Sequence, residues 1–124
     1  MSTGRLTTHV LDLSRGEPAA GMAVSLWKHE AGGAAKHCVQ SIVLNGDGRS
    51  DNPLISGESF TAGAYELLFE VQNYYAARAQ SEGLADRSTL FTRVPVFVEV
   101  KDHTAHYHIP LIISPGGYST YRGT

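Results

Sequence analysis

The sequence contains a single cysteine, Cys38. One thiol rules out a disulfide within the chain, and it also rules out a zinc or iron–sulfur site built from several thiolates. Such sparing use of cysteine is typical of a reducing compartment. No apolar leader follows the first methionine, and no apolar run approaches the roughly 18 residues that a membrane-spanning helix needs. We therefore expect a cytoplasmic protein with no membrane partner.

An excess of charge of one sign is also missing. The chain has 10 Lys and Arg residues against 12 Asp and Glu residues, a formal net charge of −2. This balance supplies no field strong enough to attract a phosphate backbone, so nucleic acid is not an expected partner. Hydrophobic residues make up 42% of the 124 residues, and no linker or internal repeat divides them. The sequence predicts one folded domain, residues 1–124.

Alternation of apolar side chains with period 2 is abundant, and it is the pattern of half-buried β-strands. Clusters of Gly, Pro, Asn and Ser between strand candidates are typical of tight turns. Short strands joined by tight turns predict a β-sandwich. Pro95 and Pro110 lack a backbone donor, so each should lie at a sheet edge or interrupt a ladder. The alternating segments are 6–13, 22–27, 64–71, 93–100 and 106–113.

One stretch departs from the alternation. Asn73 is a suitable N-cap, good helix formers follow it, and Gly83 is a suitable stop signal. The sequence therefore predicts one short helix over Asn73–Gln80.

Two histidines of the segment 106–113 lie on an unusual strand face. If Tyr107 and every second residue after it face the core, then His106 and His108 point outward. An outward face of a sandwich usually carries Thr, Lys and Glu, whereas this one also holds Pro110 and Ile112. We expect such a face to be covered by another subunit or to enclose a pocket. The segment 6–13 shares this feature, because Leu6, Thr8 and Val10 alternate with Thr7, His9, Leu11 and Leu13.

Histidines also have ordinary explanations. Any one of the six, for example His29 or His37, is more often a surface residue or a hydrogen-bonded core residue than a functional one. A His-x-His pair on one strand face can also present two ligands to zinc, so His106 and His108, with His9 or His103, are candidate metal ligands. The sequence contains neither a dinucleotide-binding nor a P-loop motif, and it has no G-x-S-x-G nucleophile elbow.

Two further polar groups have more than one interpretation. Arg49 follows the glycine-rich turn 45–48, and it is either a solvated cation or a fork of donors that stabilises an anion. The terminal segment Tyr121–Thr124 either frays, as chain ends commonly do, or contributes to a site. Spacing alone decides neither question.

Three segments together resemble the transthyretin-related 5-hydroxyisourate hydrolases. They are the opening 6–20, which begins Leu-Thr-Thr-His-Val-Leu-Asp-Leu, the Asp-Gly-Arg turn 47–49, and the ending 106–124. The ending begins His-Tyr-His and closes with Tyr-Arg-Gly-Thr, where the family motif has Ser in the last place. The resemblance spans nearly the whole chain. It implies an all-β, transthyretin-like (prealbumin-like) sandwich of two antiparallel sheets with one short helix.

The resemblance also implies roles for individual residues. The family's catalytic positions correspond to His9, Arg49 and His108, and its substrate-binding positions to His9, Arg49, Tyr121 and Thr124. No metal and no cofactor is implied. The implied assembly is a homotetramer, a dimer of dimers whose active sites lie in the channel between the two dimers. A covered channel would account for the apolar residues beside His108.

On this assignment we expect hydrolysis of 5-hydroxyisourate to 2-oxo-4-hydroxy-4-carboxy-5-ureidoimidazoline, a step of purine (urate) breakdown. A neutral imidazole, His9 or His108, can activate water, and Arg49 can stabilise the oxyanion. Two alternatives stay open. One is a non-catalytic carrier of small ligands with the same fold. The other is a zinc-dependent hydrolase that uses the His106-x-His108 pair.

Overall fold

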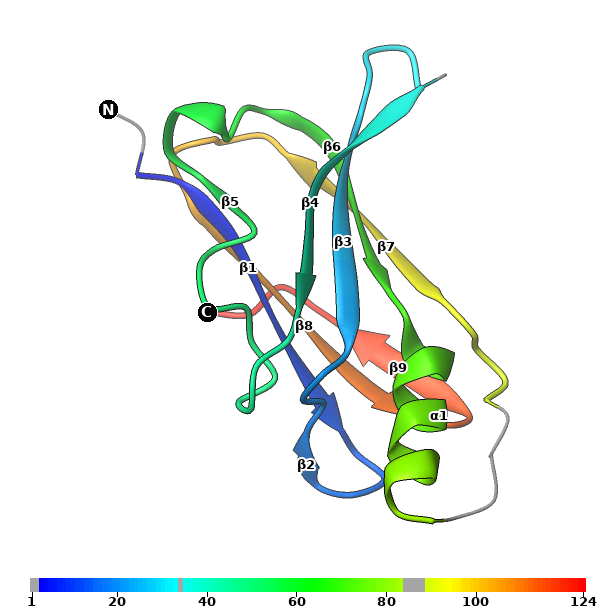
Figure 1. Ribbon diagram of the computed structural model, residues 1–124. Coiled ribbons are helices and arrows are strands. Elements are labelled where there is room, and N and C mark those ends of the chain that lie inside the picture. Colours follow the sequence, from blue (N-terminus) through cyan, green and yellow to red (C-terminus); the bar gives the residue numbers. More distant parts are fainter. Residues whose placement is uncertain (1–2, 34, 84–88) are drawn as a thin grey trace.

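A computed structural model describes residues 3–33, 35–83 and 89–124, so residues 1–2, 34 and 84–88 of the predicted domain lie outside the described residues. The described residues are mostly strands (Figure 1). In chain order the elements are β1 (Arg5–Asp12), β2 (Glu17–Pro18), β3 (Ala23–His29), β4 (Lys36–Val43), β5 (Ile55–Ser56), a 3-10 turn (Gly57–Ser59), β6 (Gly63–Phe69), α1 (Val71–Ser81), β7 (Val94–Val100), β8 (His106–Ser114) and β9 (Gly117–Thr120).

The strands form two sheets, which confirms the predicted β-sandwich of two sheets with one short helix. One sheet has the order β2-β1-β8-β9, with β5 also paired to β1, and the other has the order β4-β3-β6-β7 (Figure 1). All pairings are antiparallel except β1 with β8, which run parallel from Arg5 beside His106 to Asp12 beside Ile113. Alternation does not encode strand direction, so the sequence could not predict this parallel pair.

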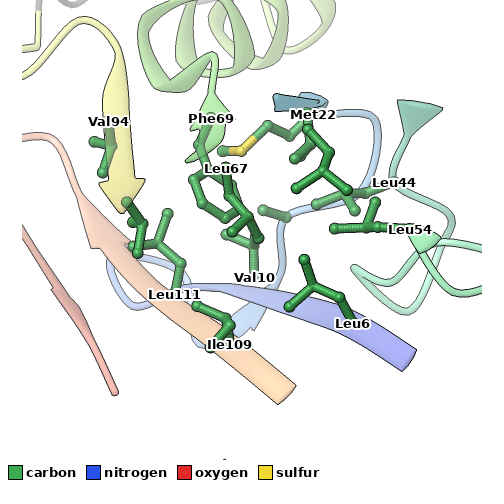
Figure 2. Packing of buried hydrophobic residues seen from close by; sticks show 14 of the residues in the cluster. Leu6, Val10, Met22, Leu44, Leu54, Leu67, Phe69, Val94, Ile109 and Leu111 are labelled. Atoms are coloured by element: carbon green, nitrogen blue, oxygen red, sulfur yellow. The ribbon is translucent and has the colours of Figure 1, made fainter. Parts of the chain in front are cut away.

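The core lies between the two sheets and contains the predicted inward faces. Leu6 and Val10 of β1, Leu111 of β8, and Leu67 and Phe69 of β6 all contribute to this core (Figure 2). All five side chains are buried. Burial of apolar area at about 25 cal/mol per Å² is the main force that holds the sheets together. The opposite faces of β1 and β8 are therefore left for other contacts.

Both prolines lie where the missing donor predicts. Pro95 is in β7, which forms an edge of its sheet. Pro110 is in β8 between two neighbours, and there the ladder to the C-terminal segment is interrupted. β9 ends at Thr120 opposite Leu111, and pairing resumes only at the bridge between His108 and Gly123.

Four strands were not predicted, and each lacks a strong alternation of its own. β2 and β5 contain two residues each, and β9 contains four. β4 is longer, but it forms a sheet edge and its side chains are mostly exposed. A strand that buries little side-chain surface leaves no period-2 signal in the sequence.

The helix begins two residues before the predicted start. α1 runs from Val71 to Ser81 with Glu70 at its N-cap, so Asn73 lies in the first turn and caps nothing. The reason is packing, because Val71, Tyr74, Tyr75 and Ala79 are buried and form one helical stripe. The predicted stop is confirmed: Gly83 has a φ of 68° just beyond the helix end. No helix in the described residues is long and apolar enough to cross a membrane.

A buried carboxylate ties α1 to β1. Asp12 is 0% exposed, and the hydroxyls of Tyr74 and Tyr75 donate to its two oxygens at 2.9 and 2.7 Å. Burial, and then the bond to Asp12, raises the pKa of both tyrosines, so they stay protonated donors. This anchor fixes one end of the strand that also carries Thr7 and His9.

Candidate active site

The turn 45–48 lies directly on β1 and brings Arg49 next to His9. His9 and Arg49 form an antiparallel bridge, and the Val10 amide donates to the Gly48 carbonyl at 2.9 Å. Gly48 has a φ of 74°, and a Cβ at this position would lie 2.6 Å from the Val10 carbonyl oxygen. Only glycine fits so close an approach. The glycine-rich turn is therefore what positions the arginine.

The parallel pairing of β1 and β8 places His108 beside Thr7. His108 Nδ1 lies 2.7 Å from Thr7 Oγ1 on the outward face of the sheet. The C-terminal segment covers the other side of the ring, because the Gly123 amide donates to the His108 carbonyl at 2.7 Å. A Cβ at Gly123 would come within 2.6 Å of His108 Cδ2. The glycine of the terminal Tyr-Arg-Gly-Thr segment therefore allows this segment to lie against the histidine.

An open pocket of about 320 Å³ lies over this face. It brings together three of the predicted residues, Arg49, His108 and Thr124, from positions far apart in the sequence. The residues that complete the wall are Arg5, Thr7, Thr8, Ser50, Asp51, Asn52, Pro53 and His106. Residues that carry a guanidinium, an imidazole and a hydroxyl thus border one space of small-molecule size.

His9 stands close to this group without lining the pocket. Burial lowers the pKa of His9, and the Arg49 guanidinium lowers it further, against an opposing effect of Asp47. Burial also lowers the pKa of His108, and electrostatic repulsion by Arg49, and by His106 and His9 when they are protonated, adds to the effect. Both imidazoles are therefore neutral at neutral pH, the form that can accept a proton.

Within one chain, Tyr121 lies apart from the other predicted site residues. Its side chain is 57% exposed and lines a different pocket, next to Phe97 of β7 and Ile109 of β8. Tyr121 follows β9, an edge strand, so its ring reaches the open side of the sandwich between the two sheets. Its predicted role in substrate binding stays a prediction.

Sequence reasoning missed two residues of the site. Thr7 has its hydroxyl between two imidazoles, and Arg5 lines the pocket beside His106. The available signal was weak: alternation places Thr7 on the same strand face as His9. Only the register of β1 against β8 shows that Thr7 also lies beside His108.

The His-x-His pair gives little support to a metal site. Both nitrogens that face each other, Nε2 of His106 and Nδ1 of His108, bond the hydroxyl of Thr7 between them. In the described ranges, no three His, Cys, Asp or Glu side chains gather closely enough to hold a metal ion. The donor set is therefore poor for zinc, which usually takes at least three protein ligands.

The chain is similar to known proteins over nearly its full length. The chain is 44% identical over 122 residues to 5-hydroxyisourate hydrolase 2 of Rhizobium meliloti, and the match covers 98% of both chains. The structure of Klebsiella pneumoniae 5-hydroxyisourate hydrolase aligns with a TM-score of 0.77 at 36% identity, over 97% of this chain and 99% of that one.

A longer protein contains a similar unit. The structure of (S)-allantoin synthase aligns with a TM-score of 0.85 at 33% identity, over 99% of this chain and 44% of that one. A model of the HIUase/Transthyretin family matches residues 6–123. With the match extending over nearly every residue and the site geometry in place, this chain belongs to the HIUase/Transthyretin family.

Proposed function

We propose that this protein hydrolyses 5-hydroxyisourate to 2-oxo-4-hydroxy-4-carboxy-5-ureidoimidazoline, as a step of urate breakdown in the cytoplasm. The observation that carries the proposal is the convergence of Arg49, His108 and Thr124 on one pocket, with His9 beside them. The names of the full-length relatives support the same substrate.

His108 is the general base in this proposal, because it lines the pocket and His9 does not. Neutral His108 takes a proton from water as the water oxygen forms a bond to a ring carbonyl carbon of the substrate. The carbon–nitrogen bond of the ring then breaks, and the nitrogen leaves with a proton. His9 lies beside Arg49, and its electrostatic effect lowers the pKa of His108.

Arg49 stabilises the oxyanion that forms when water attacks. Its guanidinium is a planar fork of donors that stays charged at any working pH, and the turn 45–48 holds its backbone against β1. A donor fixed in advance needs no reorganisation when charge develops on the oxygen. Thr124 lines the same pocket and supplies a hydroxyl that can orient the substrate ring.

The proposed assembly is a homotetramer, a dimer of dimers. Its support is the apolar character of the outer face next to the site, where Leu13 is 62% exposed and Ile112 is half-buried. A second copy packed on this face would remove that area from water and enclose the pocket. In such an assembly, Tyr121 of a neighbouring subunit can contact the substrate.

The test is the ultraviolet decay of freshly generated 5-hydroxyisourate. Wild-type protein should accelerate the decay, and His108→Ala should lose about 100- to 10,000-fold in turnover, the usual contribution of a general base. The control is His37→Ala. His37 is an exposed residue of the edge strand β4 that pairs with Glu30, and its replacement should leave the rate unchanged.

The outcomes separate the alternatives. Wild-type protein that binds the substrate and leaves its decay unchanged or slower would identify a carrier. Activity that disappears on chelation and returns with zinc would identify the metal-dependent hydrolase. A normal rate in His108→Ala would remove His108 from the mechanism.

A further inference from the structure

The hydroxyl of Thr7 joins two imidazoles at the wall of the pocket. Thr7 Oγ1 lies 2.7 Å from Nδ1 of His108 and 2.8 Å from Nε2 of His106. The centroids of the two rings are 6.1 Å apart. The parallel register sets this arrangement, because it pairs Thr7 with His108 and places His106 one strand step away on the same face. These three side chains form one continuous chain of hydrogen bonds.

A hydroxyl carries a single proton, so hydrogen-bond donation runs in one direction through the three side chains. If Thr7 donates to His106, it must accept from Nδ1–H of His108, and His108 Nε2 then holds a free lone pair. If Thr7 donates to His108, then His106 must donate to Thr7, and His108 Nε2 carries the proton instead. The first state makes His108 a neutral base, and the second makes it a neutral acid.

The two imidazoles at the ends of this hydrogen-bond chain differ in exposure and in the charges beside them. His108 is half-buried and lies near the positive charge of Arg49, whereas His106 is exposed. Burial lowers the pKa of His106, and the positive charges of Arg5 and Arg122 lower it further. Both imidazoles have a lowered pKa, so neither holds an extra proton at rest. A positive charge on His108 is therefore unfavourable beside Arg49. A route that passes a proton on to solvent removes this charge.

We propose that Thr7 is a positioning residue that passes protons between His108 in the pocket and His106 at the solvent. The inference rests on the proposed function and adds a route for its protons. When water gives a proton to His108 Nε2, Nδ1–H passes its proton to the Thr7 oxygen. The Thr7 hydroxyl passes its own proton to His106 Nε2, and His106 releases one from Nδ1 to solvent.

The reverse transfer completes the cycle. His108, now protonated at Nε2 alone, gives that proton to the departing ring nitrogen. Thr7 returns a proton to His108 Nδ1 and takes one from His106 Nε2, while His106 regains one from solvent at Nδ1. Each group ends in its starting state, and no proton is gained or lost over the cycle. His108 thus changes from base to acid without remaining an imidazolium beside Arg49.

The first experiment compares Thr7→Val with Thr7→Ser. Valine keeps the shape of threonine and removes the hydroxyl, whereas serine keeps the hydroxyl. We expect Thr7→Val to lose roughly tenfold or more in kcat with KM nearly unchanged, and Thr7→Ser to retain most of the wild-type rate. Thr61→Val is the matched control, because its hydroxyl bonds Lys28 and does not line the pocket.

In a proton inventory, kcat is measured in mixtures of light and heavy water. This measurement distinguishes a relay from a merely structural role of Thr7. The dependence of kcat on the heavy-water fraction should be curved for wild type and Thr7→Ser, because several protons move together. It should become linear for Thr7→Val. Identical curves for wild type and Thr7→Val, or an unchanged kcat, would overturn the relay.

The solvent end of the relay has its own test. His106→Ala should lower kcat, and added imidazole should restore a large part of the lost rate, because position 106 is exposed. Failure of imidazole to restore any rate would contradict the release of protons to solvent through His106. This measurement also stands if Thr7→Val does not fold.

The outcome for wild type separates the two proposals. Wild-type protein without activity would refute the proposed function. Active wild type with no effect of Thr7→Val would refute only the relay. Nitrogen NMR of the imidazoles gives a further reading without substrate, because loss of the Thr7 hydroxyl should change the tautomer balance of His108.

Discussion

The outer faces of the two sheets carry the same types of residue in opposite arrangements. On the sheet of β4, β3, β6 and β7, His29 and Lys36 both bond Glu66 Oε1, at 3.0 and 3.1 Å. On the sheet of β1 and β8, the guanidinium of Arg49 lowers the pKa of His108, and the other two groups that act on it, His106 and His9, are imidazoles. One face pairs its charges directly, and the other leaves a guanidinium beside neutral imidazoles at a pocket.

The pKa directions express this difference. Burial alone would raise the pKa of Glu66, but hydrogen bonds from His29 and Lys36 outweigh burial, and the pKa is lowered. On the other face, burial and like charge act together on His108, and both lower its pKa. Paired charges thus stabilise the fold, whereas burial and the neighbouring guanidinium keep an imidazole neutral and ready to accept a proton.

The largest effect should follow removal of the arginine on the pocket face. Arg49→Ala should lower kcat for 5-hydroxyisourate about 100- to 1,000-fold, or about 2.7–4 kcal/mol, because the oxyanion loses its donor. Arg93→Ala is the matched variant on the paired face, where Arg93 bonds Glu70 at 3.0 Å. Equal rates in both variants, measured by substrate decay, would remove the functional contrast between the faces.

The paired face should respond in stability instead. Glu66 is 4% exposed, so Glu66→Gln should reduce the free energy of unfolding by about 1–3 kcal/mol at neutral pH. Because the folded-state pKa of Glu66 is lowered, its contribution is present above the ordinary value of 4.5 and is lost as pH falls. The difference between variant and wild type should therefore shrink in acid.

Urea unfolding at several pH values measures this effect. Glu30→Gln is the control, since the exposed pair of Glu30 with His37 should contribute no more than about 0.5 kcal/mol. A Glu66→Gln protein as stable as wild type at neutral pH would show that the buried pairs do not hold this face. Activity of the folded variant should be near normal, because Glu66 lies outside the candidate active site.

The smallest effect is a change in pH dependence. His108 acts as a base only when neutral, so kcat/KM should be level at neutral pH and fall only below the ordinary imidazole value of 6.5. Arg49→Gln removes a positive neighbour and should raise the pKa of His108 in an NMR titration, whereas Arg93→Gln should not. A His108 pKa that stays in place would show that burial alone sets it.

Much of the fold could be predicted from the sequence. The inward faces of β1, β3, β6, β7 and β8 follow from alternation, because burial of every second side chain is what a sandwich requires. The strands β2, β4, β5 and β9 were missed since they are short or bury little, and the start of α1 was misplaced since packing of Val71 decided it. Local signals fail where tertiary contacts supply most of the energy.

The candidate site divides in the same way. Resemblance of the motifs identified His9, Arg49, His108 and Thr124, and the structure brings Arg49, His108 and Thr124 to one pocket. Tyr121 shows the limit, because its ring lies on the open side of a single chain. Its part in the site depends on neighbours that one sequence does not place in space.

The sequence by itself determined which side chains face the core, where the chain turns, and which residue types are available for chemistry. These are local properties, set by side-chain period and by the backbone freedom of glycine and proline. Only the tertiary structure decided that β1 and β8 run side by side in parallel, with Thr7 between His106 and His108. Strand register arises from contacts between segments about a hundred residues apart, and no local pattern encodes it.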